Sequence, residues 1–260
     1  MRHGPGVFMK IRDCKAVFDR ATELLGFSVP ELCFEKNDRL DITEYTQAAM
    51  VTTSVAMMKV MEERGIHADV AAGLSLGEYC ALVAAGVMTA DDAIRTVRER
   101  GILMQEAVPA GVGGMSAVLG MTADEINAVV DEIPNVQVAN YNCPGQIVIS
   151  GLKEAVEIAA VKLKEAGARR VIPLKVSGPF HSYLLEEAGE KLGKFLENIP
   201  VSEPKIPYVA NVTAAYVTKA EDVKPLLTRQ VSSSVRWQQS VETMLADGVD
   251  RFIEIGPGKT

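Results

Sequence analysis

The stretch Gly73-Leu74-Ser75-Leu76-Gly77 lies between an apolar tetrapeptide, Asp69-Val70-Ala71-Ala72, and Glu78-Tyr79-Cys80-Ala81-Leu82-Val83-Ala84-Ala85, which ends at Gly86. We interpret these segments as a strand, a sharp turn and a helix. In a corner of the form G-x-S-x-G, the glycines let the strand and the helix approach each other closely. The sharp turn exposes the serine hydroxyl as a nucleophile. The N–H groups at the helix N-terminus favour negative charge beside that hydroxyl. The pattern predicts a nucleophilic Ser75, the alternative being a chance match in a Gly- and Ala-rich helix start.

The composition of the 260 residues is that of a globular protein, with 48% apolar and 23% charged residues. A net charge of −7 argues against broad binding to nucleic acids or anionic membranes. No apolar run is long enough to span a bilayer, and the N-terminus has no signal-peptide core. The cysteines Cys14, Cys33, Cys80 and Cys143 form no C-x-x-C pair, which excludes a zinc knuckle and predicts reduced thiols. We expect a cytoplasmic monomer without a metal.

The spacing of apolar residues predicts helices over 16–25, 43–63 and 90–107, the last capped by Thr89 and Asp92. Pro109 and the glycines that follow then interrupt the chain. The next segments predict the order β-α-β-β-α-β, with strands at 115–119, 136–141, 146–149 and 170–176 and helices at 122–133 and 154–166. The pattern Thr122-x-x-Glu125 predicts a capping box at the start of the first of these helices. Further short apolar strands are predicted at 208–210 and 252–255.

This order of elements predicts an α/β protein built from two parts. Residues 1–111 and 178–260 are expected to form the larger, α/β-hydrolase-like domain with a parallel sheet. Residues 112–177 are expected to form an inserted, ferredoxin-like α+β subdomain.

A serine nucleophile needs a base, and histidine suits neutral pH because its unperturbed pKa is about 6.5. The chain has three histidines. His3 lies in a terminal segment, and His67 precedes the predicted elbow strand in a polar stretch where an exposed structural role is expected. His181 lies at the junction of the two predicted domains, where a cleft is expected. His181 is therefore the strongest base candidate, the alternative being a neighbour of a helix cap without a catalytic role.

The sequence offers no clear acid to orient that histidine. A serine hydrolase would carry Asp or Glu between the serine and the histidine. The aspartates considered there, Asp91, Asp92, Asp124 and Asp131, are each expected at a helix cap or on a solvated face. We therefore expect no triad completed by an acid.

Arg100 lies near the middle of the helix predicted over 90–107. Its sequence context, Arg98-Glu99-Arg100-Gly101, fits a solvated basic turn. In a pocket, the same guanidinium would bind a substrate carboxylate through two parallel hydrogen bonds.

Several longer stretches extend the pattern of the elbow, and they occur in order with believable spacing. They are Gly73–Val87, Arg98–Gly101, Met104–Pro109, Asn140–Gln146, Gly178–Ser182, Asn211-Val212, Val235–Trp237 and Glu254–Lys259. Together they resemble the malonyl-CoA:acyl carrier protein transacylases of bacterial fatty acid synthesis, over roughly residues 14 to 260.

The resemblance implies a role for each matching residue of the reaction centre. Ser75 would carry the malonyl ester and His181 would be its base. Arg100 would hold the free carboxylate, and the backbone N–H of Leu76 would be one oxyanion donor. The backbone carbonyl of Gln230 would orient the histidine in place of an acid.

The resemblance also implies residues that shape the cleft. Asn142 and Asn211 would line it, and the ring of Phe180 would leave little room for an α-methyl group. The chain departs from the family at Leu74, where the family usually has histidine. The family's first strand and its Phe-Pro-Gly-Gln-Gly segment are not recognisable, so we expect a chain truncated at both ends.

The function that follows from the resemblance is transfer of a malonyl group from malonyl-CoA to the pantetheine thiol of acyl carrier protein, through a serine ester and without a cofactor. Two alternatives stay open: a serine thioesterase, and a non-catalytic or impaired remnant of the family. A run of basic residues, Lys162, Lys164, Arg169, Arg170 and Lys175, is either a docking face for the acidic carrier protein or an ordinary solvated face.

Overall fold

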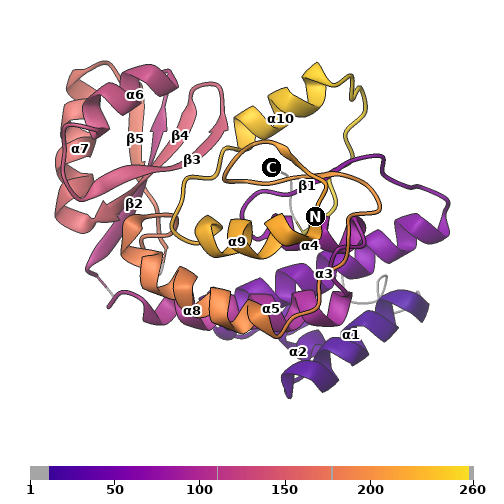
Figure 1. Cartoon of the computed structure of the whole chain (residues 1–260). Coiled ribbons are helices and arrows are strands. Elements are labelled where there is room, and N and C mark those ends of the chain that lie inside the picture. The colour runs from indigo at the N-terminus through magenta and orange to yellow at the C-terminus, as the bar shows by residue number, and fades with distance from the viewer. Residues whose placement is uncertain (1–11, 110, 177, 258–260) are drawn as a thin grey trace.

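Two separate β-sheets organise the chain, which confirms the mixed α/β class. A computed structural model describes residues 12–109, 111–176 and 178–257. One sheet has three strands in the order β1-β6-β7, and the other has four in the order β3-β4-β2-β5. In Figure 1 the four-stranded sheet lies on the left with α6 and α7, and the other helices lie below it and to its right.

The three-stranded sheet is mixed rather than parallel as predicted. β1 (Ala71–Ala72) pairs parallel to β6 (Tyr208–Val209), which pairs antiparallel to β7 (Tyr216–Val217). Its helices are α1 (Arg12–Leu25), α2 (Val29–Phe34), α3 (Thr43–Glu63), α4 (Gly77–Ala84), α5 (Ala90–Glu106), α8 (Glu186–Glu197), α9 (Ala220–Gln230) and α10 (Trp237–Ala246), with short 3₁₀ turns at Arg39–Asp41 and Tyr183–Leu185. The apolar faces of all of these helices except α10 share one buried core, which includes Phe18, Val55, Leu82, Leu192 and Tyr208. α10 contacts β3 (Val136–Cys143) of the other sheet instead.

The four-stranded sheet follows the predicted order of elements. It is built from β2 (Gly113–Leu119), α6 (Ala123–Val130), β3 (Val136–Cys143), β4 (Gln146–Leu152), α7 (Lys153–Glu165) and β5 (Arg170–Pro173), and neighbouring strands are antiparallel. The side chains of Thr122 and Glu125 form the predicted capping box at the start of α6.

The two faces of this sheet have different partners, because successive side chains of a strand point to opposite sides. Ile147 and Ile149 of β4 belong to the core that α6 and α7 complete. Val148, between them, belongs to a small second cluster with Met115 and Ala139. Phe180 packs against this cluster and also against the core around the other sheet. The loop that carries Phe180 is therefore fixed between both parts of the molecule.

The strand predicted at 252–255 is wrong. Residues 251–255 form no helix or strand, and the side chains of Phe252 and Ile253 are about half exposed, at 49% and 51%. A strand is stabilised by hydrogen bonds to a neighbour, and none of the described strands pairs with this segment. The apolar pattern alone could not reveal the missing partner.

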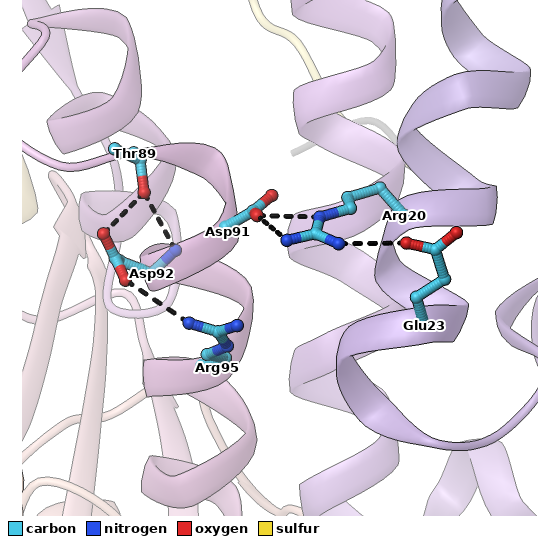
Figure 2. Close-up of polar contacts among 6 residues, drawn as sticks. All are labelled: Arg20, Glu23, Thr89, Asp91, Asp92 and Arg95. Atoms are coloured by element: carbon cyan, nitrogen blue, oxygen red, sulfur yellow. Dashed lines mark hydrogen bonds and ion pairs between the residues drawn. The ribbon is translucent and has the colours of Figure 1, made fainter.

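Asp91 and Asp92 lie in the first turn of α5, at a helix start on the surface as predicted (Figure 2). The Thr89 hydroxyl accepts a hydrogen bond from the Asp92 N–H at 3.1 Å and donates to the Asp92 carboxylate at 2.6 Å. Asp91 binds Arg20 of α1, with 2.8 Å between its carboxylate and Nε of the guanidinium. Asp124 lies in the first turn of α6 and Asp131 at its C-cap. None of these four carboxylates is an orienting acid for the histidine.

Within the ranges that the structure describes, no helix is both long and apolar enough to cross a membrane.

Candidate active site

The corner between β1 and α4 holds Ser75 in an unusual backbone conformation. Its φ angle is +51°, in the left-handed region that residues other than glycine rarely adopt. Asn211 holds this corner from the loop after β6: its side-chain oxygen accepts from the Ser75 N–H at 2.6 Å, and its side-chain nitrogen donates to the Gly73 carbonyl at 2.7 Å. A Cβ on Gly73 would lie 2.0 Å from the Gly77 carbonyl group, so this position requires glycine. The corner is therefore a tight turn locked by a buried amide.

Ser75 and His181 have the geometry expected of a nucleophile and its base. The distance from Ser75 Oγ to His181 Nε2 is 2.6 Å, and His181 Nδ1 lies 2.9 Å from the backbone oxygen of Gln230. A carbonyl oxygen can only accept, so Nδ1 carries the proton and Nε2 is left to accept one from the serine. The geometry thus brings together Ser75, His181 and the backbone of Gln230, with the carbonyl in the place of an acid.

The environment of His181 keeps its imidazole neutral. The ring is 3% exposed, and burial lowers the pKa of His181 to about 4, with the positive charge of Arg100 as the second cause. The hydrogen bond to the Gln230 carbonyl opposes this shift. A neutral imidazole is the form that can take up the serine proton.

The backbone of His181 is also left-handed, with a φ angle of +56°. The side chain of Gln137 in β3 donates to the His181 carbonyl at 3.1 Å and accepts from the Tyr183 N–H at 3.0 Å. Through Gln137, the four-stranded sheet therefore holds the backbone around His181 in position. Strained backbone at both reacting residues is a recurrent property of functional sites.

Arg100 is buried beside the nucleophile, so it does not form a solvated turn. It is 2% exposed, and its Nη2 lies 3.2 Å from Ser75 Oγ and 3.1 Å from Gln230 Oε1. Its Nη1 donates to Gln47 Oε1 of α3 at 2.7 Å, whereas Nε has no acceptor among the described residues. The next residue, Gly101, lets α5 approach α3, because a Cβ there would lie 2.5 Å from the Glu44 Cα. A buried cation with an unused donor suits an anionic ligand group.

Glu78 is a site residue that our sequence analysis missed. It lies in the first turn of α4, three residues after Ser75, and is 1% exposed. Its Oε2 accepts from Gln230 Nε2 at 2.7 Å and from the Asn211 N–H at 3.2 Å. Burial raises the pKa of Glu78 to about 7, opposed by those two hydrogen bonds and by Arg100. The signal was present, because Glu78 is the single charged residue of the apolar α4.

The remaining predicted residues differ in their burial and in their hydrogen bonds. The Leu76 N–H, at the start of α4, has no backbone or side-chain acceptor among the described residues, so it is available as an oxyanion donor. Phe180 directly precedes the base. Asn142, near the end of β3, has no hydrogen bond to Ser75 or His181, and its side-chain oxygen is buried without a partner in the described part of the chain. Leu74 is half-buried in the corner, and His67 is exposed.

No group of acidic, cysteine or histidine side chains in the described residues could hold a metal ion. His3 lies outside the described residues. The hydroxyl of Ser75 lies within hydrogen-bond distance of both the neutral imidazole of His181 and the buried guanidinium of Arg100. Such a set can form a covalent acyl ester on Ser75 and favours an acyl group that carries its own negative charge.

The comparisons with known proteins agree with this chemistry. Residues 8–259 match the family model described as acyl transferase domain. The malonyl CoA-acyl carrier protein transacylase of Bacillus subtilis is 46% identical over 261 residues, which cover 98% of this chain and 82% of that protein.

Solved structures give the same result. An acyl carrier protein S-malonyltransferase from Vibrio cholerae superposes with a TM-score of 0.93 at 42% identity, covering 96% of this chain and 83% of the other. A malonyl-transacylase solved in complex with a type II polyketide synthase acyl-carrier protein superposes with a TM-score of 0.93 at 41% identity, covering 96% and 82%.

Proposed function

We propose that this chain, which belongs to the malonyl CoA-acyl carrier protein transacylase family of acyl transferases, transfers a malonyl group from malonyl-CoA to the pantetheine thiol of acyl carrier protein. The observation that carries the proposal is the position of Arg100 Nη2, 3.2 Å from the same Ser75 oxygen that lies 2.6 Å from His181 Nε2. A carboxylate bound by Arg100 would belong to the acyl group that Ser75 receives.

In the first half-reaction, His181 Nε2 takes the proton of Ser75 as the serine oxygen attacks the thioester carbonyl carbon. The oxyanion that forms accepts a hydrogen bond from the Leu76 N–H, which has no acceptor among the described residues. The carbon–sulfur bond then breaks, and His181 returns the proton to the sulfur of coenzyme A.

The second half-reaction repeats these steps with another thiol. The carrier thiol gives its proton to His181 and attacks the ester carbonyl carbon. The carbon–oxygen bond to Ser75 breaks, and His181 returns the proton to the serine. The covalent intermediate predicts ping-pong kinetics.

Selectivity for malonyl over acetyl groups follows from Arg100. A malonyl carboxylate can bind the planar guanidinium through two parallel hydrogen bonds. An acetyl group would leave the buried cation without that partner, which is costly where water is excluded. Phe180, between the two parts of the molecule, would restrict space for an α-methyl group.

The same family assignment supports the finer description of the fold. We assign residues 1–111 and 178–260 to an α/β-hydrolase-like core and residues 112–177 to a ferredoxin-like insertion. The antiparallel order β3-β4-β2-β5 and the separate buried core of the insertion support this division. We place Asn142 and Asn211 along the cleft between them, and the protein in the cytoplasm as a monomer.

The basic residues of the insertion are our candidate docking face for the acidic carrier protein. Lys162, Lys164, Arg169, Arg170 and Lys175 are all exposed. A relative of this chain has been solved in complex with its acyl-carrier protein. Opposite charges speed encounter between partners.

The test is intact-mass analysis after brief exposure to malonyl-CoA. We expect one malonyl adduct in the native chain, none in Ser75→Ala, and little or none with acetyl-CoA. Addition of carrier protein should then remove the adduct, more slowly in Arg169→Glu than in Lys59→Glu, an exposed control on α3. Loss of the adduct to water would favour a thioesterase, and a folded chain without any adduct would contradict the proposal.

A further inference from the structure

The carboxylate of Glu78 is bound on two sides by parts of the chain that meet at the reaction centre. Gln230, at the end of α9, donates to it through Nε2 at 2.7 Å, and Asn211, after β6, donates through its backbone N–H at 3.2 Å. The same Asn211 holds the Ser75 N–H at 2.6 Å. Glu78 thus fixes the two residues that in turn fix the nucleophile.

The side chain of Gln230 can adopt only one orientation between these neighbours. Its oxygen faces Arg100 Nη2 at 3.1 Å, and its nitrogen donates both to Glu78 and to the Ser75 carbonyl, the latter at 2.9 Å. A guanidinium only donates and an ionised carboxylate only accepts, so a flipped amide would lose both contacts. The backbone oxygen of the same residue orients His181 at 2.9 Å. A change in the position of Gln230 would therefore displace both Ser75 and His181.

Glu78 also supplies a negative charge opposite Arg100 without binding its donors. The amide of Gln230 lies between the two charged groups. A buried guanidinium without a compensating charge is unfavourable, yet a direct ion pair would occupy the donors that a substrate carboxylate needs. Burial raises the pKa of Glu78, and the positive charge of Arg100 opposes that rise, which favours the ionised carboxylate.

We propose that Glu78 is a positioning residue of the transfer reaction: its ionised carboxylate orients Gln230 and Asn211 around Ser75 and balances the charge of Arg100. This inference rests on the function proposed above. Glu78 acts through its neighbours, since none of its hydrogen bonds reaches Ser75 Oγ or His181. The backbone carbonyl of Gln230 orients the imidazole in place of an acid, and Glu78 binds the side chain of that same residue.

The charge makes the proposal testable by pH. The ionisable groups that face Glu78 are Arg100 from α5, Tyr79 from its own helix and Tyr208 from β6. Burial raises the pKa of both tyrosines, so they stay neutral near pH 7. Glu78, whose pKa burial raises to about 7, is thus the group of this set expected to titrate between pH 6 and 8.

The experiment compares kcat/KM for Ser75 acylation by malonyl-CoA between pH 5 and pH 8 in the native chain and in Glu78→Gln. The glutamine keeps the shape and an acceptor oxygen but removes the charge. We expect Glu78→Gln to be about tenfold slower at pH 8, in kcat rather than in KM. The native chain should lose activity in a step near pH 7 and approach the variant at pH 6, whereas the variant shows no such step.

Glu31→Gln is the matched control, because Glu31 is an exposed acid in the first turn of α2. It should behave as the native chain throughout. Glu78→Asp is a second variant for the case in which Glu78→Gln does not fold. It keeps the charge on a side chain that is one methylene shorter. Acylation of Ser75 should be slower in this variant, and the step near pH 7 should remain. Native rates and an unchanged profile in a folded Glu78→Gln, or in Glu78→Asp if that is the variant that folds, would overturn the inference. Failure of the native chain to form any malonyl adduct would instead overturn the proposed function.

Discussion

Single residues of this site gain their chemistry from burial. His181 and Glu78 are 3% and 1% exposed, and each is shifted toward its neutral form. The two shifts have opposite effects on stability. A depressed histidine pKa contributes stability above pH 6.5 that is lost as the pH falls toward 4. A raised carboxyl pKa contributes stability at low pH that is lost as the pH rises toward 7.

Between pH 6 and pH 4 the two groups oppose each other, because Glu78 is neutral in the folded chain and still largely ionised in the unfolded chain over most of this interval. The contribution of His181 is therefore measured by difference. On going from pH 6 to pH 4, the free energy of unfolding should drop by roughly 1–3 kcal/mol more in the native chain than in His181→Gln, whose side chain cannot be protonated. Urea unfolding of both proteins at the two pH values measures this difference. An equal change in both proteins would show that His181 is not protonated on unfolding.

At the scale of elements, the strand–turn–helix corner depends on one glycine more than the other. A Cβ on Gly73 would lie 2.0 Å from the Gly77 carbonyl group, whereas a Cβ on Gly77 would meet no atom within 4 Å. The two glycines of the same motif are therefore not equivalent.

Gly73→Ala should consequently displace the corner, lower the melting temperature by several degrees and slow acylation by a hundredfold or more. Gly77→Ala, in the first turn of α4, should retain native stability and most of its activity. Thermal unfolding and single-turnover acylation of the two variants provide the comparison. Similar losses in both would mean that the second glycine has a role that the packing does not show.

The elements themselves were predictable where a local signal marks their ends. The caps at Thr89 and Thr122 and the helix over 43–63 agree with the sequence because capping and apolar spacing act within a few residues. The absence of a strand at 252–255 was not predictable. A single charge in the apolar α4 marks Glu78 as unusual but does not give its role, because that role, like strand pairing, depends on what lies beside the residue in space. A strand needs a partner, and a glutamate at a helix start normally faces water.

At the scale of the whole molecule, the four-stranded sheet contacts the loop that carries His181, the proposed base. Gln137 of β3 donates to the backbone oxygens of His181 and Ser232 at 3.1 and 3.3 Å. Further along β3, the backbone pairs with Val235, whose N–H donates to Ala139 at 2.8 Å. The four-stranded sheet thus sets the position of a residue that belongs to the other part of the chain.

Gln137→Ala should loosen the left-handed backbone of His181 without touching the substrate. We expect a reduction in kcat of about tenfold, little change in KM, and only a small loss of stability. Gln238→Ala, which removes an exposed pair with Glu242 on α10, is the control and should be close to native. Steady-state kinetics with malonyl-CoA and carrier protein distinguish them. A rise in KM with unchanged kcat would indicate that Gln137 shapes the binding cleft instead.

The chain enters and leaves the part that contains the four-stranded sheet at two points that touch. A Cβ on Gly113, the first residue of β2, would lie 2.4 Å from the ring of Pro179, just before the base. Because the two ends of this segment lie side by side, the distance between the flanking parts of the chain does not depend on the length or sequence of the segment. In evolutionary terms, such a segment can be replaced by another one whose ends adjoin in the same way, while the corner that holds Ser75 stays in place. The replacement has one condition: it must present a side chain that binds the backbone of His181 as Gln137 does.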